Sequence, residues 1–351
     1  MKKILIISQN KSPRGAYKAA VELGYTLKSS PSNKVNFFTE VTACKNKISS
    51  LKIKLFKFIN KYIKILFRGN NEITNTLPQF FKFLDHKKFK YDVILINCGY
   101  EFLSIKDIIL FRKPTFILIH DMWFFGGVKH YFRESVSKKN FKINFLNLYE
   151  FFNYFSWKFK MEYLNQNKKL VFVASSYWLK KQASLSVMLR NHKVEKIYTP
   201  VDVLFWRKLD KNKCRKKLNL PVKKKLILFV AKGGLKNFRK GGDYFLKIIN
   251  NFKDQEMINF IVLGQSITEI SKSDKNIVFI SFKDNKEKLR DLYNSVDLVF
   301  CLSRYENIPY SMIESMSCGI PNISTNVGGI NEIISHKKNG WLLKNQSITQ
   351  I

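Results

Sequence analysis

The chain has 351 residues, of which 45% are hydrophobic, and it carries 62 basic against 26 acidic side chains. This length and apolar content suffice for two domains with separate cores, and they exclude an intrinsically disordered chain. The net charge of +36 indicates either an anionic partner, such as nucleic acid or a membrane surface, or a lysine-rich composition without a function.

The five cysteines are scattered, odd in number and without Cys-x-x-Cys or Cys/His ligand spacing. They therefore predict neither a disulfide framework nor a zinc site, and a reducing cytoplasm fits them best. The apolar run Ile4–Ile7 after the basic start imitates a signal peptide, but it stops at Ser8, and we interpret it as a first β-strand. No apolar stretch of the sequence approaches the roughly 18 residues that span a bilayer, so we expect no integral membrane protein.

Short apolar runs alternate with longer helical patterns along the whole chain. The predicted strands are Lys3–Ser8, Lys34–Thr39, Val93–Asn97, Thr115–His120, Leu170–Ala174, Leu226–Ala231, Asn259–Leu263, Ile277–Ile280, Leu298–Leu302 and Pro321–Ser324. Apolar strands separated by helices indicate an α/β fold with doubly wound parallel sheets. Pro200 interrupts the pattern and divides the chain into domains 1–200 and 201–351. Because such sheets bind ligands beyond the carboxyl ends of their strands, we expect a central cleft faced by both domains.

Gly15 opens the helix predicted after the first strand. Without a side chain there, the backbone can approach a nucleotide or an acceptor closely.

A basic amphipathic helix is predicted around residues 51–68. Its apolar residues on one side are Leu51, Leu55, Phe58, Tyr62, Ile65 and Leu66, and its basic residues on another are Lys54, Lys57, Lys61, Lys64 and Arg68. Such a helix rests on an anionic membrane surface or packs its apolar side on the N-terminal sheet, and the pattern leaves both interpretations open.

His120 ends the predicted strand Thr115–His120 and faces the expected cleft. A structural histidine satisfies this pattern, but Asp121 and Trp123 cluster at the same strand end, which favours a functional role.

The loop after the strand Leu226–Ala231 combines glycines with basic residues. Gly233 permits close approach to a ligand, and Arg239 and Lys240 stand directly before two further glycines. The place of Lys240 after a strand and before two glycines favours a functional role, although Lys240 is also one of many lysines in the chain.

Two glutamates follow the strand Leu298–Leu302. Glu306 lies in a predicted loop and Glu314 in the short helix after it, which Pro309 begins. The amino end of this helix favours a diphosphate, and each carboxylate can accept hydrogen bonds from two adjacent hydroxyls. On spacing alone, two solvated charges are the favoured explanation of the pattern.

These residues belong to a longer ordered pattern. It comprises Glu306-Asn307-x-Pro309, Glu314, Cys318-Gly319-x-Pro321, Gly328-Gly329-Ile330 and Asn339-Gly340, and upstream Phe238-Arg239-Lys240-Gly241 and Thr199-Pro200-Val201-Asp202. The pattern resembles the donor site of glycosyltransferase family 4, whose GT-B fold joins two Rossmann-like domains. His120-Asp121-Met122-Trp123-Phe124 is similar to members that build bacterial surface polysaccharides, so the resemblance covers nearly the whole chain.

The resemblance implies a role for each candidate residue. Glu306 and His120 would act near the reacting sugar, and Glu314 would hold the ribose. Lys240, with Arg239, would neutralise the diphosphate, whose charge grows as it leaves. Asn307, Gly233 and Gly15 would complete the donor site. The sequence contains no Asp-x-Asp, so we expect no metal, and the nucleotide-sugar is a substrate with no separate cofactor.

We therefore expect a retaining glycosyltransferase that moves a sugar from a nucleotide-sugar donor to a hydroxyl of a growing cell-surface glycan or lipid-linked acceptor. The expected location is cytoplasmic, at the inner face of the plasma membrane. Two alternatives stay open: a basic nucleic-acid-binding protein, which lacks a recognisable binding module, and a GT-B-fold sugar-nucleotide epimerase.

The resemblance also implies further helices after Trp341. Only eight residues follow Leu343, so we expect a shortened C-terminal domain with weakened coupling between the domains.

Overall fold

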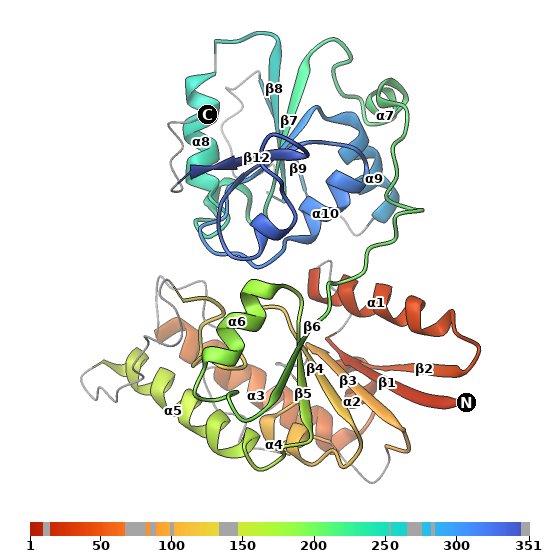
Figure 1. Ribbon diagram of the computed structural model, residues 1–351. Coiled ribbons are helices and arrows are strands. Elements are labelled where there is room, and N and C mark those ends of the chain that lie inside the picture. Colours follow the sequence, from red (N-terminus) through yellow and green to blue (C-terminus); the bar gives the residue numbers. More distant parts are fainter. Residues whose placement is uncertain are drawn as a thin grey trace. The chain divides into compact units, whose positions relative to one another are not determined.

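The computed structural model describes residues 1–9, 15–66, 82–84, 89–98, 102–132, 147–252, 254–264, 276–281 and 285–344 (Figure 1). The chain divides into two compact units, Met1–Pro200 and Val201–Ile351. Each unit contains a six-stranded sheet whose paired strands are all parallel. The predicted α/β fold with two doubly wound sheets is confirmed.

The N-terminal sheet has the strand order β2-β1-β3-β4-β5-β6. Its strands are β1 (Lys2–Ser8), β2 (Asn33–Phe38), β3 (Val93–Cys98), β4 (Thr115–Ile119), β5 (Leu170–Ala174) and β6 (Lys193–Lys196). The helices of this unit are α1 (Gly15–Lys28), α2 (Glu40–Cys44), α3 (Lys47–Leu66), α4 (Ile105–Ile109), α5 (Leu148–Leu164) and α6 (Tyr177–Leu185).

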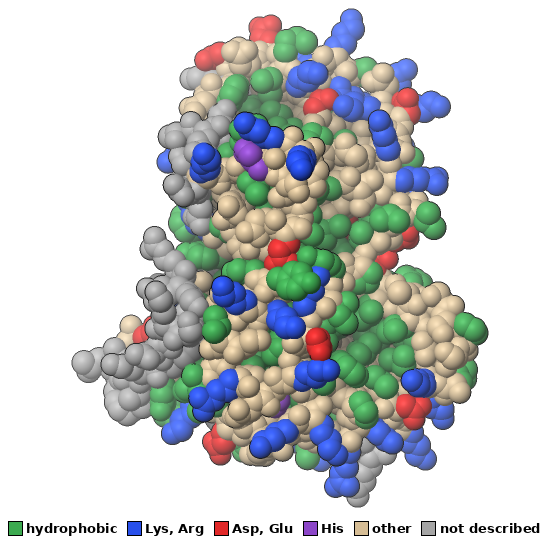
Figure 2. Space-filling view, viewed as in Figure 1, with side chains coloured by type: hydrophobic (Ala, Val, Ile, Leu, Met, Phe, Trp, Pro, Cys, Tyr) green, Lys and Arg blue, Asp and Glu red, His purple; other side chains and the backbone are tan. Residues whose placement is uncertain are grey.

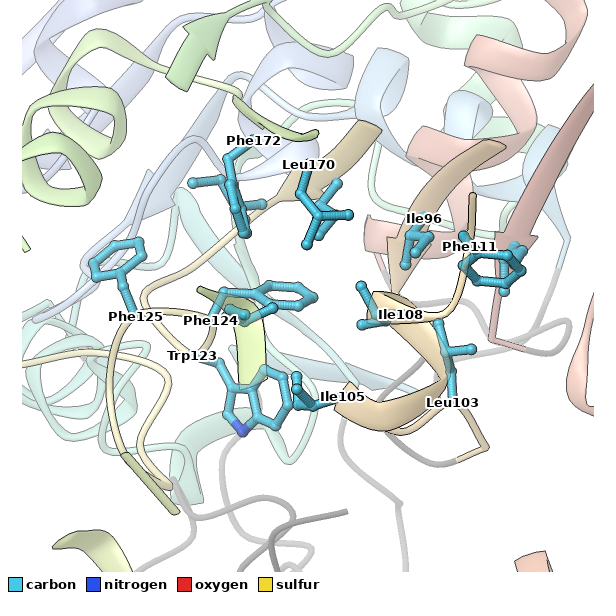
Figure 3. Close-up of a cluster of buried hydrophobic side chains, with 14 of the residues drawn as sticks. Ile96, Leu103, Ile105, Ile108, Phe111, Trp123, Phe124, Phe125, Leu170 and Phe172 are labelled. Atoms are coloured by element: carbon cyan, nitrogen blue, oxygen red, sulfur yellow. The ribbon is translucent and has the colours of Figure 1, made fainter. Parts of the chain in front are cut away.

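An aromatic core fills one face of this sheet (Figure 3). Phe124 packs edge-on against Phe172 of β5 at a centroid distance of 6.1 Å, and Trp123 against Phe124 at 5.2 Å. Figure 3 also shows Ile105 and Ile108 of α4 beside these rings. The segment that follows β4 is therefore anchored in the core rather than running over the surface.

The C-terminal sheet has the order β12-β11-β10-β7-β8-β9. Its strands are β7 (Lys225–Val230), β8 (Ile258–Leu263), β9 (Ile277–Ile280), β10 (Leu298–Cys301), β11 (Asn322–Thr325) and β12 (Gly340–Leu343). Its helices are α7 (Lys211–Lys217), α8 (Gly242–Asn251), α9 (Lys286–Ser295) and α10 (Tyr310–Ser317), with 3₁₀ turns η3 (Gly234–Lys236) and η5 (Ile330–Glu332). Leu228 and its neighbour Phe229 enter different buried clusters, so apolar side chains cover both faces.

All ten predicted strands are confirmed, with ends that differ by at most one residue. Two observed strands were not predicted, β6 and β12, and both lie at sheet edges. β6 reads Lys-Val-Glu-Lys and none of its residues is fully buried. An edge strand needs no continuous apolar run, because one of its sides pairs with nothing in the sheet.

The helix predicted around residues 51–68 exists as α3, but its predicted apolar side does not pack on the sheet. Leu51 and Phe58 are 70% and 58% exposed, whereas Ile53 and Phe56 enter the core from the opposite face. The packing interpretation is therefore wrong for Leu51, Leu55, Phe58 and Tyr62. Arg68 and the side chains of Lys64, Ile65 and Leu66 lie outside the described residues. Within the described ranges, no helix is long and apolar enough to cross a membrane.

Candidate functional site

The centre of the C-terminal sheet is a topological switch point. β7 and β10 are adjacent, and the strands that follow them extend in opposite directions, β8 and β9 to one side and β11 and β12 to the other. Open α/β sheets bind ligands beyond the carboxyl ends of the two strands at such a point. The loops at these ends are residues 231–241 after β7 and residues 302–309 after β10.

Three predicted site residues meet between these loops. The Glu306 carboxylate accepts a hydrogen bond from Arg239 Nη1, with Oε2 at 3.3 Å, and a second one from Lys240 Nζ. Its other oxygen accepts from the backbone N–H of Asn307 at 3.2 Å. Glu306 is 7% exposed and Asn307 3%. The structure thus joins two cations from the loop after β7 to one carboxylate from the loop after β10.

The electrostatics of this cluster keep Glu306 ionised. Burial alone would raise the pKa of its carboxyl group, but Lys240 and Arg239 outweigh burial and lower the pKa to about 2. Two cations face one carboxylate, so the cluster carries one net positive charge at neutral pH. A partly buried site with this charge attracts anions.

Arg304 connects the two loops, a role that sequence reasoning missed. Its guanidinium forms a bidentate pair with Asp243 at 2.6 and 2.7 Å, and it stacks on the rings of Phe238 and Tyr244 at 3.6 and 3.9 Å. Its backbone N–H also donates to Arg239 O at 2.8 Å. Bidentate pairing lowers the pKa of Asp243 and raises that of Arg304. The segment bearing Arg239 and Lys240 is therefore fixed beside Glu306.

Glycines permit the close approach of these loops. Gly241 and Gly328 have φ of +77° and +60°, and a Cβ atom there would stand 2.1 Å from Leu302 O and 1.7 Å from Glu306 O, respectively. Gly233 has φ of +89°, and a Cβ atom there would meet nothing within 4 Å. The space beside the Gly233 backbone is therefore open, and the role of Gly233 in the donor site stays a prediction.

Glu314 lies apart from the cation cluster in its described contacts. It is 1% exposed on α10, and its Oε2 accepts a hydrogen bond from Tyr293 of α9 at 3.0 Å. Burial, together with the carboxylate, raises the pKa of Tyr293 well above its ordinary value. The Tyr293 hydroxyl therefore keeps its proton at every physiological pH and donates a hydrogen bond to Glu314, which holds the carboxylate in one orientation.

A second polar cluster lies in the N-terminal unit, again at a switch point, between β1 and β3. His120 Nε2 bonds Asn97 Oδ1 at 2.8 Å, and Asn97 Nδ2 donates to Ala16 O at 2.6 Å and to Ser8 Oγ at 3.2 Å. Because Asn97 Oδ1 can only accept, Nε2 is the protonated nitrogen. Burial lowers the pKa of His120, against the opposing effect of Asp121, so the imidazole is neutral at pH 7. Asn97 thus links His120 to the start of α1, where Gly15 lies.

Buried Lys160 supports the segment after β4. Its Nζ donates to Gly127 O at 2.7 Å and to Trp123 O, and it lies 4.0 Å from the Trp123 ring centroid. Asp121 pairs with His130 at 2.5 Å in the same segment. The roles of Lys160 and Asn97 could not be predicted from the sequence, because each residue contacts residues that are distant in the chain.

Among the described residues, no group of three or more acidic, histidine or cysteine side chains could hold a metal ion. The absence of a metal from the reaction stays a prediction.

Comparison with known proteins bears on this geometry. Residues 210–351, which carry Arg239, Lys240, Glu306 and Glu314, match the model of the family described as glycosyl transferases group 1. The resemblance to glycosyltransferases is confirmed.

A relative from Methanocaldococcus jannaschii, named as an uncharacterized glycosyltransferase, is 27% identical over 197 residues, 52% of this chain and 49% of the relative. The chain thus spans about half the length of this curated relative. Among solved structures, sucrose-phosphate synthase from Thermosynechococcus elongatus has a TM-score of 0.63 at 14% identity, covering 99% of this chain and 87% of that one. Anabaena HepE in complex with UDP-glucose has a TM-score of 0.57 at 15% identity, covering 98% and 85%. These glycosyltransferase-type structures confirm the GT-B fold.

Proposed function

We propose that this protein is a retaining glycosyltransferase that takes a sugar from a nucleotide-sugar donor. The observation that carries the proposal is the cluster of Arg239, Lys240 and ionised Glu306 at the switch point of the C-terminal sheet. Two cations fixed there stabilise the diphosphate as it leaves with growing negative charge. The HepE structure contains UDP-glucose, which supports the same class of donor here.

In this proposal, Glu306 accepts hydrogen bonds from sugar hydroxyls while Asn307 and the amino end of α10 border the donor. Glu314 holds the ribose, and the uncovered backbone at Gly233 lies along the nucleotide. In the N-terminal unit, His120 acts near the reacting sugar, and Gly15 lets the backbone approach the nucleotide or the acceptor. No side chain is assigned as a nucleophile, and a front-face displacement assisted by the leaving phosphate accounts for retention.

We assign the acceptor as a hydroxyl of a growing cell-surface glycan or a lipid-linked sugar. The reaction then takes place in the cytoplasm, at the inner face of the plasma membrane. Product analysis with and without an acceptor separates this activity from epimerisation, in which the nucleotide-sugar itself changes and no acceptor is needed.

The test of the donor site compares two lysines. Lys240→Gln removes a cation of the site, whereas Lys247→Gln removes an exposed one from α8, so both lower the net charge equally. We expect Lys240→Gln to weaken UDP binding by about 1.5–3 kcal/mol, the contribution of a hydrogen bond to a charged group. Calorimetry that shows the same affinity for both variants would contradict the assignment.

A further inference from the structure

An apolar stripe runs along the solvent face of α3. Its members are Ile48, Leu51, Leu55, Phe58 and Tyr62, which are 67%, 70%, 55%, 58% and 54% exposed. We call this set the α3 stripe. The alternating spacing of three and four residues places all five side chains on one face of the helix. Phe58 and Tyr62 also contact each other, with ring centroids 4.7 Å apart.

The opposite face of α3 fixes the orientation of the helix. Ile53 and Phe56 are 1% and 3% exposed, and Phe56 packs against Phe83 with ring centroids 5.5 Å apart. The buried Ser49 hydroxyl donates to Phe83 O at 2.7 Å. Because this face is held by the core, the helix cannot turn the stripe inward without losing its packing. Exposure of the stripe is a property of the folded unit.

Lysines border the stripe on both sides. At about 100° per residue, Lys47, Lys54 and Lys61 follow one edge and Lys52 the other. All four are exposed, and the sequence of α3 contains no acidic residue. Long lysine side chains can lie along an apolar surface while their ammonium groups reach out of it.

These charges decide between two occupants. The spacing of the stripe also suits a coiled-coil seam with a second copy of the chain. In that pairing, however, the bordering positions of both helices would be lysines, and like charges would face each other along the interface. An anionic lipid surface instead offers phosphate groups to the lysines and an acyl boundary to the stripe.

We propose that the α3 stripe and its bordering lysines dock the N-terminal unit on an anionic membrane. This binding does not depend on the reaction proposed above. If that reaction holds, docking would bring the enzyme to acceptors carried by lipids. The remaining lysines and arginines are scattered over the visible face of both units, as Figure 2 shows, so a general attraction by net charge must be separated from docking.

The experiment measures sedimentation with vesicles of phosphatidylcholine containing 30% phosphatidylglycerol, at 100 mM salt. Substitution of Lys52, Lys54 and Lys61 by Gln removes three bordering charges, and substitution of Lys213, Lys216 and Lys247 by Gln removes three exposed charges in the C-terminal unit. We expect the first variant to bind on the order of a hundredfold more weakly, at about 1 kcal/mol for each lysine near the surface. The second variant should keep most of its binding.

A second pair of variants tests the apolar contribution. Substitution of Leu51 and Leu55 by Ser should weaken vesicle binding roughly tenfold or more. Substitution of Leu204 and Leu246 by Ser, at two exposed leucines of the C-terminal unit, should leave it unchanged. All variants should bind UDP with the affinity of the parent protein, since none of the substituted residues belongs to the cluster of Arg239, Lys240 and Glu306. Unchanged circular dichroism spectra would show that the variants fold.

Three results would overturn the proposal. The first is equal binding to vesicles with and without phosphatidylglycerol, or none to either. The second is an equal loss in the two lysine variants, which would mean attraction by net charge alone. The third is a dimer at 100 mM salt that the Leu51 and Leu55 substitutions dissociate, which would assign the stripe to a second copy.

Discussion

Glu306 is a carboxylate held between two cations, and this pairing makes its substitution informative. In Glu306→Gln, Arg239 and Lys240 keep their charges and lose their common partner. If Glu306 acts on the sugar as charge develops, kcat should fall by about a hundredfold, whereas UDP binding should stay the same or strengthen. Steady-state kinetics together with calorimetry measure the two effects. A fall in UDP affinity with unchanged kcat would assign Glu306 to the nucleotide instead.

The same pairing predicts a pH dependence of stability. The pKa of Glu306 is about 2 in the folded protein, below its ordinary value of 4.5, so the folded state favours the ionised form. This contribution is fully present above pH 4.5 and is lost as the pH falls towards 2. It amounts to on the order of 3 kcal/mol of unfolding free energy. In urea denaturation between pH 6 and pH 3, the free energy of unfolding should fall more steeply for the parent protein than for Glu306→Gln. Parallel plots of this free energy against pH would refute the ionised pair.

Glu314 offers a test that uses the ligand as well as the protein. If its carboxylate holds a ribose hydroxyl, Glu314→Gln should weaken UDP binding by about 1.5–3 kcal/mol. The same substitution should have little effect on the affinity for 2′,3′-dideoxy-UDP, which lacks the two ribose hydroxyls. An equal loss for both nucleotides would mean that the substitution acts through the buried bond to Tyr293 and the packing of α10.

Alanine substitutions at two glycines with positive φ test how closely the loops of the C-terminal unit pack. Gly319 and Gly328 have φ of +78° and +60°, so alanine strains both by about 1–2 kcal/mol. At Gly319 the new Cβ meets only Lys208 Cδ at 3.9 Å, whereas at Gly328 it overlaps Glu306 O. We expect Gly319→Ala to have a lower melting temperature but the full turnover number. Gly328→Ala should lose turnover more than tenfold, because it displaces the loop 302–309 that carries Glu306. Similar turnover in both variants would show that this loop is not constrained as described.

Ten of the twelve described strands were predictable because they carry short runs rich in apolar residues, a signal that lies within a few neighbouring residues. The orientation of α3 was not predictable from the sequence. The helical period places Leu51 and Leu55 on one face and Ile53 and Phe56 on another, but it does not say which face enters the core. The sequence also indicated Arg239, Lys240 and Glu306 individually. Their mutual pairing depends on β7 and β10 being neighbours in the sheet, which no local pattern contains.

For the whole molecule, the two sheets have their switch points at different places in the chain, between β1 and β3 and between β7 and β10. Each point gathers polar side chains that are distant in sequence, Asn97 with His120 in one unit and Lys240 with Glu306 in the other. Residues that hold these loops, such as Arg304 and Asn97, were missed because their partners are 61 and 81 positions away. Spatial support of a site is a property of the folded chain.

The exposed α3 stripe should also influence how the protein behaves in concentrated solution without lipid. At low ionic strength, we expect the bordering lysines to keep two copies apart. The Debye length shrinks from about 30 Å at 0.01 M salt to about 3 Å at 1 M, so added salt removes this repulsion and leaves the apolar contact intact. Colloidal stability should therefore decline as salt rises, and a mild anionic amphiphile that covers the stripe should restore it.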